Sequence, residues 1–304
     1  MIERFVKFIF FGNYFVGLLG IVLSIETVMQ LQLPFNSMIY YVLLFSGTVM
    51  YYTYAYSGVL QSSSTNNLRS EWYRQHHGFV RYSQWFLLLL CIILGIFMLI
   101  TNFRNIIDLP LHYWVIVIVI FLSSVLYYGL LPKSIFKLNL RNTGWLKAFV
   151  IGFVWAACVG LLPIVVLRAE GKWFVLDPVL MLVLFIKNWM FCTVNAMMFD
   201  FKDYADDSNK QLQTFVVRFG LNRTISYVLI PLIVIGIGCA LAFMHYRRLE
   251  ILPALILLLP FFLLLIVSYS MYRQKSIFYY LIVIDGLVMV KGLCGILAVP
   301  FIYH

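Results

Sequence analysis

The chain has 304 residues, of which 63% are hydrophobic and only 11% are charged, and its formal net charge is +10. Soluble domains carry roughly 45–50% apolar and about 25% charged residues, so a soluble protein of this composition would lack the polar side chains to cover its surface. A lipid-exposed surface removes that difficulty, and the composition therefore predicts an integral membrane protein. The basic residues lie in short segments between apolar runs, which indicates membrane topology, and no nucleic acid partner is expected.

Apolar runs follow one another along residues 1–304, which we interpret as a single transmembrane domain. Most runs have 20–26 residues, long enough to cross about 30 Å of hydrocarbon. The first run has no small-residue cleavage site after it, so we interpret it as a retained helix and not as a signal peptide. The pattern predicts an all-α polytopic bundle of about nine transmembrane helices, at 5–26, 37–60, 82–101, 112–131, 147–167, 175–199, 223–246, 251–271 and 277–302.

The distribution of Lys and Arg predicts the orientation of these helices. With the N-terminus in the cytoplasm, fifteen of the 22 Lys and Arg residues fall in inside segments and five in outside segments. Cytoplasmic segments of membrane proteins are enriched in Lys and Arg, so this bias predicts an N-terminus inside and a C-terminus outside. We expect the chain to reside in the plasma (inner) membrane, with its active site facing the cytoplasm.

Four aspartates gather at the cytoplasmic end of the sixth predicted span. The chain has only twelve acidic residues, and four of them are Asp200, Asp203, Asp206 and Asp207. If the helix continues through them, Asp200 and Asp207 lie about 20° apart around its axis, and Asp203 about 60° away. Three carboxylates on one face repel each other unless a cation lies between them, and hard oxygen ligands suit Mg²⁺. The alternative is a solvated acidic loop that ends a helix.

The segment 195–220 resembles the second aspartate motif of the UbiA-type intramembrane prenyltransferases. That family's pattern is D-x-x-x-D, six residues, Thr or Ser, and an apolar stretch that ends in Gly. The matching positions here are Asp203, Asp207, Thr214 and Gly220, with Asp200 where Asn or Asp is common. The resemblance implies a UbiA-like helical bundle in which Asp203 and Asp207 are catalytic and, together with Asp200, hold Mg²⁺.

The family's first motif, N-x-x-x-D-x-x-x-D at the end of helix two, has no counterpart. No carboxylate occurs between Thr27 and Ser70, so we expect one metal site instead of two. Cations are then expected to share the neutralisation of a diphosphate. The expected diphosphate ligands are Arg69, Arg74, Lys147, Lys202 and Lys210.

The resemblance implies transfer of a prenyl group from a polyprenyl diphosphate to an apolar acceptor, expected to be aromatic, within the membrane. Two alternatives stay open: a non-catalytic protein that binds an isoprenoid lipid, and a small-solute transporter, for which an internal repeat is missing. For Arg69 and Arg74 the alternative is a purely topological role. The tyrosines that end the second span, from Tyr51 to Tyr56, are either an interfacial belt or a wall whose ring faces shield an allylic cation.

Ionisable residues inside predicted spans are a separate signal of function. Lys187 lies near the middle of the sixth span, where it either recognises an acceptor or forms hydrogen bonds that stabilise the fold. Asp285 and Lys291 are six residues apart in the ninth span. They therefore lie on different helical faces, and each is expected to pair across helices, not with the other.

Overall fold

The computed structural model describes residues 2–57, 68–128, 144–204, 212–273 and 275–301. Within these ranges the chain is helical and has no strand. The first half contains α1 (Ile2–Phe11), α2 (Tyr14–Gln30), α3 (Met38–Ser57), α4 (Leu68–Gln75), α5 (His77–Thr101), α6 (Phe103–Ile107) and α7 (Leu111–Tyr128). The second half contains α8 (Leu146–Gly160), α9 (Leu162–Ala169), α10 (Pro178–Lys202), α12 (Phe215–Phe219), α13 (Leu221–Thr224), α14 (Ile230–Arg247), α15 (Ile251–Ser270) and α16 (Asp285–Ala298), with π-helical turns at Ile225–Leu229 and Tyr279–Ile284 and a 3₁₀ turn at Val299–Phe301.

Six helices in the described ranges are long and apolar enough to cross a membrane, or up to seven if the bent pair α1–α2 forms one span. The six are His77–Thr101, Leu146–Ala169, Pro178–Lys202, Leu221–Arg247, Ile251–Ser270 and Tyr279–Ala298. Helix α7 is apolar but shorter, and α3 is not among the six. The predicted all-α membrane protein is therefore confirmed in its class, whereas the count of nine spans and their orientation stay predictions.

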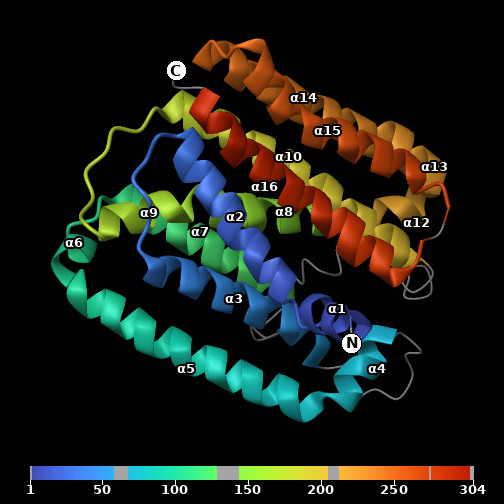
Figure 1. The fold of residues 1–304 in the computed structure, drawn as a ribbon, viewed down its shortest axis with the longest axis horizontal. Helices are drawn as coiled ribbons and strands as arrows, with labels where there is room; N and C mark the ends of the chain where they lie inside the picture. The colour runs from blue at the N-terminus through green and yellow to red at the C-terminus, as the bar shows by residue number, and fades with distance from the viewer. Residues whose placement is uncertain (1, 58–67, 129–143, 205–211, 274, 302–304) are drawn as a thin grey trace.

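The helices form one bundle, and different short helices lie at its two ends (Figure 1). Helices α14 and α15 run along one side, α3 and α5 along the other, and α2, α8, α10 and α16 lie between them. Helices α1, α4 and α12 lie at one end of the bundle, and α6 and α9 lie at the opposite end. Helix α10 ends beside α12, so Asp200 and Asp203 lie at the same end of the bundle as α1.

Helix α10 shows how local sequence sets the ends of an element. The Asp177 carboxylate accepts hydrogen bonds from the backbone N–H groups of Val179 and Leu180, at 2.9 and 3.1 Å, and Pro178 occupies the first helical turn. An Asp cap followed by Pro is a strong start signal, because both satisfy or remove donors that the helix leaves unpaired. The helix then continues through the bundle to Lys202.

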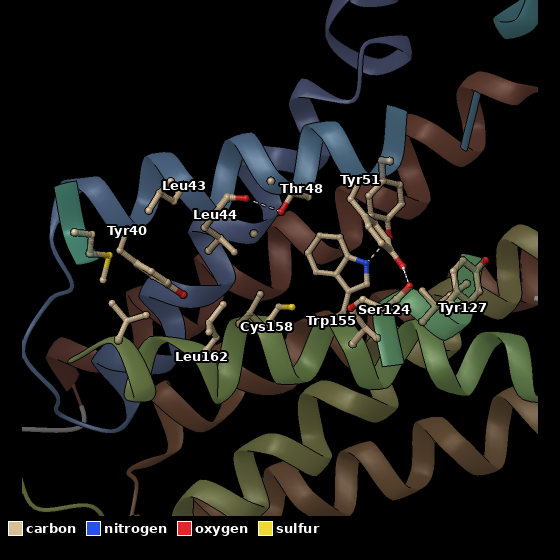
Figure 2. A pocket seen from close by; sticks show the side chains of 18 residues that line it. Tyr40, Leu43, Leu44, Thr48, Tyr51, Ser124, Tyr127, Trp155, Cys158 and Leu162 are labelled. Carbon is tan, nitrogen blue, oxygen red and sulfur yellow. Dashed lines mark hydrogen bonds between the residues drawn. The ribbon is translucent and has the colours of Figure 1, made fainter. Parts of the chain in front are cut away.

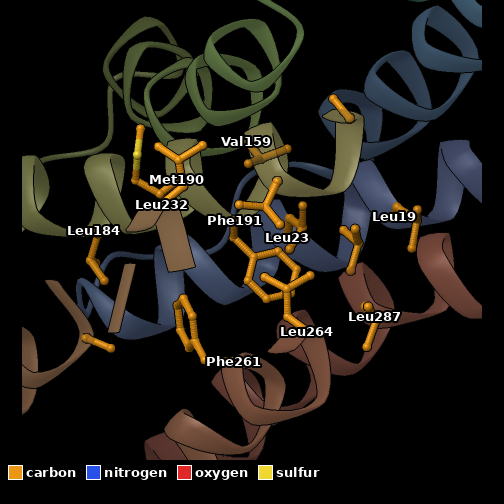
Figure 3. Packing of buried hydrophobic residues seen from close by; sticks show 14 of the residues in the cluster. Leu19, Leu23, Val159, Leu184, Met190, Phe191, Leu232, Phe261, Leu264 and Leu287 are labelled. Atoms are coloured by element: carbon orange, nitrogen blue, oxygen red, sulfur yellow. The ribbon is translucent and has the colours of Figure 1, made fainter. Parts of the chain in front are cut away.

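The interior is packed by large side chains and by close approaches of the backbone. Phe191 of α10 meets Phe261 of α15 edge to face, with ring centroids 5.4 Å apart, beside Leu23 and Leu264 (Figure 3). A Cβ added at Gly152 of α8 would come within 2.1 Å of the Thr193 hydroxyl on α10. In a bilayer, helices associate through such small-residue contacts and van der Waals packing, because lipid supplies little hydrophobic drive.

The first predicted span is wrong in one respect, because it is two helices bent by 61°. Asn13 lies at the break in the left-handed region, with φ of 63°. The Arg69 guanidinium donates to the Phe11 carbonyl oxygen at 3.3 Å and also to the Asn13 side-chain oxygen. The Tyr73 hydroxyl donates to the same Phe11 carbonyl at 2.9 Å. These contacts give hydrogen bonds to the Phe11 carbonyl, which the break deprives of its helical partner.

We predict that Arg69→Ala lowers the free energy of unfolding by about 2 kcal/mol, because buried hydrogen bonds from a charged donor are worth about 1.5–3 kcal/mol. Arg74→Ala is the matched control, since Arg74 lies on the same helix α4 and is exposed. Thermal unfolding in detergent measures both. Equal midpoints for the two variants would show that Arg69 does not stabilise the break.

Candidate functional site

The aspartate segment begins at the end of α10. Helix α10 stops at Lys202, and Asp203 is its C-cap, with φ −90° and ψ 6°. Helix α10 therefore does not continue unbroken through Asp203, and the predicted shared face of Asp200, Asp203 and Asp207 extends outside the described residues. Asp207 and Lys210, like Asp206, lie outside the described residues.

Two lysines that the sequence assigned to diphosphate binding lie beside the described aspartates. The Lys147 ammonium is 2.7 Å from an oxygen of Asp200, which is 3% exposed. The Lys202 ammonium is 3.2 Å from Asp203. Such a partner offsets the cost of burying a carboxylate charge, which is high for an unpaired group. We call these four residues the polar rim: Lys147, Asp200, Lys202 and Asp203.

The polar rim supplies only part of a metal site. Carboxylate oxygens are the ligands that Mg²⁺ prefers, and Asp200 and Asp203 lie within one helical turn. One oxygen of Asp200 already receives the Lys147 ammonium, and the described part of the chain contains no group of three acidic, His or Cys side chains able to hold a metal. The donor set fits Mg²⁺ only if Asp207 completes it.

The two arginines assigned to diphosphate binding lie on α4 and not in an open loop. Arg69 is buried against the α1–α2 break, whereas Arg74 is exposed. Arg69 also acts electrostatically on the buried carboxyl of Asp285, as does Lys202. Asp285 directly follows the π-helical turn Tyr279–Ile284, and π-helical turns are frequent at functional sites. The structure thus brings the Asp285 carboxyl within electrostatic reach of Arg69 and Lys202.

An apolar cavity of about 420 Å³ lies between α3 on one side and α8–α9 on the other (Figure 2). Tyr51, Tyr52 and Trp155 line it. The Tyr51 hydroxyl donates to the Ser124 carbonyl at 3.2 Å, and the Tyr52 hydroxyl accepts from the Trp155 indole N–H. Of the predicted tyrosine wall, Tyr51 and Tyr52 therefore face a real cavity. Tyr54 is 52% exposed, and nothing is described of the Tyr56 side chain.

One face of α8 joins the polar rim to this cavity. The cavity-lining residues of α8 and α9 include Ile151, Trp155, Cys158 and Leu162, whose spacing of three or four places them on one helical face. Lys147 precedes Ile151 by four residues and so lies on the same face, about 6 Å further along the axis. The site is therefore amphiphilic, with paired charges beyond one end of an aromatic-lined apolar cavity.

A second polar cluster lies inside the bundle and joins three helices. Glu26 of α2 lies 2.5 Å from the Lys291 ammonium of α16 and 3.5 Å from the Lys187 ammonium of α10. Lys187 also donates to Gln30 at 2.9 Å, and Lys291 donates to Asn188. These five residues, which we call the buried network, are each at most 3% exposed.

The contacts of Lys187 in the buried network agree with the interpretation that this residue stabilises the fold. Two ammonium groups share the Glu26 carboxylate, and the Phe243 ring lies 5.4 Å from the Lys187 ammonium. A Cβ at Gly295 would come within 2.4 Å of the Glu26 side chain, so glycine leaves the room that the carboxylate occupies. The prediction that Lys291 pairs across helices agrees with the geometry. Sequence reasoning missed Glu26, whose only signal was an acidic residue at the end of an apolar run.

Comparison with protein-family models, with curated proteins and with solved structures gives no match to this chain. The resemblance to UbiA-type prenyltransferases therefore rests on the sequence of segment 195–220 and on the predicted plan of nine spans.

We predict that Glu26→Gln lowers the free energy of unfolding by about 3–5 kcal/mol, because it leaves two buried ammonium groups without their carboxylate. Lys291→Met, which leaves one lysine for one glutamate, should cost less. Unfolding in mixed micelles measures each variant. Glu3→Gln is the control, since Glu3 forms an exposed pair with Lys7 and such pairs contribute little. The network would be unimportant if Glu26→Gln behaved like Glu3→Gln.

Proposed function

We propose that this protein binds a polyprenyl diphosphate within the membrane and transfers its prenyl group to an apolar, aromatic acceptor. The observation that carries the proposal is the single α8 face that leads from Lys147 of the polar rim into the aromatic-lined cavity. An anionic head and an apolar chain, joined in one molecule, match that sequence of environments. A soluble substrate has no apolar chain to fill the cavity.

In this proposal the polar rim receives the diphosphate. Lys147 and Lys202 supply positive charge, and Lys210 and Arg74 extend it from the neighbouring segments. Mg²⁺, held by Asp203 and Asp207 with help from Asp200, would supply further charge neutralisation for the diphosphate. Arg69 contributes positive electrostatic potential and no direct contact with the diphosphate, because its guanidinium donates hydrogen bonds to Phe11 and Asn13 at the α1–α2 break.

The cavity residues stabilise the prenyl group while its bond to the diphosphate breaks. When the C1–O bond breaks, its electron pair leaves on the diphosphate and an allylic cation remains. The faces of Tyr51, Tyr52 and Trp155 stabilise such a cation through their ring electrons, and apolar walls keep water away from it. The acceptor ring supplies the electrons of the new carbon–carbon bond and then loses a proton.

The same proposal includes a UbiA-like bundle of nine spans with the N-terminus inside and the C-terminus outside, in the plasma (inner) membrane. The 15-to-5 distribution of basic residues supports this orientation. The polar rim shares the α1 end of the bundle (Figure 1), so an inside N-terminus places the rim at the cytoplasmic face.

A non-catalytic isoprenoid-binding protein is the second candidate. The missing carboxylates of the first motif favour it, as does the engagement of Arg69 at the helix break. Such a protein would use the same cavity and the same rim to hold a lipid without breaking its C1–O bond.

We predict that Asp203→Asn and Asp207→Asn each weaken binding of a non-hydrolysable prenyl diphosphate analogue at least about tenfold, or about 1.4 kcal/mol, and remove its dependence on Mg²⁺. Calorimetry on protein in lipid nanodiscs measures this. Asp177→Asn is the matched control at the other end of α10, where Asn still caps the helix. Unchanged affinity in both rim variants would contradict the proposal.

Turnover separates the two candidates. Wild-type protein is incubated with prenyl diphosphates, Mg²⁺ and a panel of aromatic acceptors, and released pyrophosphate is measured. Pyrophosphate release that depends on Asp203 supports the transferase, whereas tight binding without release supports the lipid-binding protein.

A further inference from the structure

The end of the cavity farthest from the polar rim is formed by a buried tyrosine. Figure 2 shows Tyr40 and Leu162 at one end of the cavity and Tyr51 and Tyr127 at the other. Tyr40 is 3% exposed, and its hydroxyl forms a hydrogen bond of 3.2 Å with Ser24 of α2. The ring is thus fixed between α3 and α2.

Hydrogen bonds close the bundle next to Tyr40. The Asn36 side-chain amide donates to the Pro163 carbonyl of α9 at 2.9 Å, and the backbone N–H of Ser37 donates to Glu170 at 3.2 Å. These bonds tie the segment before α3 to α9, so the two walls of the cavity are joined where it ends. Tyr40 packs against Tyr41 with ring centroids 5.3 Å apart, which further restricts rotation of the ring.

We propose that Tyr40 is the floor of the chain-binding cavity and limits the length of the prenyl group that this protein accepts. The inference rests on the proposed function and concerns its substrate class: a short prenyl donor whose chain ends inside the protein. From Ile151 to Val166 the lining of α8 and α9 runs fifteen residues, or about 22 Å at about 1.5 Å per residue. A chain longer than this has to bend back or leave apolar carbon outside the cavity.

A cavity that ends at Tyr40 and a tunnel that is open there predict different dependences of affinity on prenyl chain length. In an open tunnel, each added isoprene unit gains van der Waals contacts with the lining and increases affinity. In a cavity with a floor, affinity rises with chain length until the chain reaches Tyr40, and then stops rising or falls, because overpacking a filled interior is unfavourable.

The experiment measures dissociation constants of non-hydrolysable geranyl, farnesyl, geranylgeranyl and longer prenyl diphosphate analogues in nanodiscs with Mg²⁺. Tyr40→Ala removes a ring about as large as one isoprene unit, so the optimum should move one unit longer. The ratio of affinities across that step should change at least about tenfold. Tyr40→Phe keeps the ring and should keep the wild-type optimum.

Gly47 provides a variant in the opposite direction. It lines the cavity, and a Cβ placed there meets nothing within 4 Å, so the side chain of Gly47→Leu begins in open space and should move the optimum one unit shorter. Phe86→Ala is the matched control, because Phe86 lines a different groove, beside Tyr41 and Leu87, and its loss should leave the optimum unchanged.

The outcomes separate the two proposals. Affinity that rises with every added unit in wild type, or an optimum that is the same in wild type, Tyr40→Ala and Gly47→Leu, overturns the floor and leaves the proposed function standing. Failure of wild type to bind any analogue overturns the proposed function and the floor with it. Opposite shifts in Tyr40→Ala and Gly47→Leu support the floor.

Discussion

The ion pairs of Glu26 with Lys187 and Lys291 are the interaction on which the rest of the structure depends. Lipid gives helices little hydrophobic reason to associate, and unpaired charges in its interior are costly, so the three charges lie where α2, α10 and α16 meet. That contact fixes α10 along the bundle axis. Helix α10 then packs closely on α8 at Gly152, and α8 carries both Lys147 and one wall of the cavity. The positions of Lys147 and of the α8 wall of the cavity therefore depend on the ion pairs of the buried network.

The charged groups of the candidate site lie at the end of the bundle, and its aromatic side chains lie in the interior. Charges collect where α8 begins and α10 ends, and there they compensate each other in the pairs Lys147–Asp200 and Lys202–Asp203. The interior offers aromatic faces whose hydroxyls already have partners within the protein, as with Tyr51 and Tyr40. In the proposed function, an anionic diphosphate competes for the first region and an apolar chain occupies the second. Neither region alone distinguishes a lipid diphosphate from simpler ligands.

Much of this arrangement could be predicted from sequence, because the signals are local. Apolar run length predicted most helices, and the D-x-x-x-D spacing indicated the end of α10. The bend at Asn13 could not be predicted, since it is stabilised by Arg69, 56 residues away. Glu26 and Lys291 are separated by 265 residues, and only the fold brings them together. Helix α4 lies between the second and third predicted spans, and its buried Trp72 and Tyr73 pack on Phe11, a contact that no local pattern shows.

The measurement that tests the central claim most directly is a structure by electron cryomicroscopy, in nanodiscs, with a non-hydrolysable farnesyl diphosphate analogue and Mg²⁺. The account predicts chain density between α3 and α8, extending from Tyr51 toward Tyr40, and a diphosphate within hydrogen-bonding distance of Lys147. Chain density along α14 and α15 instead, or a diphosphate bound away from the Asp200–Asp203 end of α10, would contradict it.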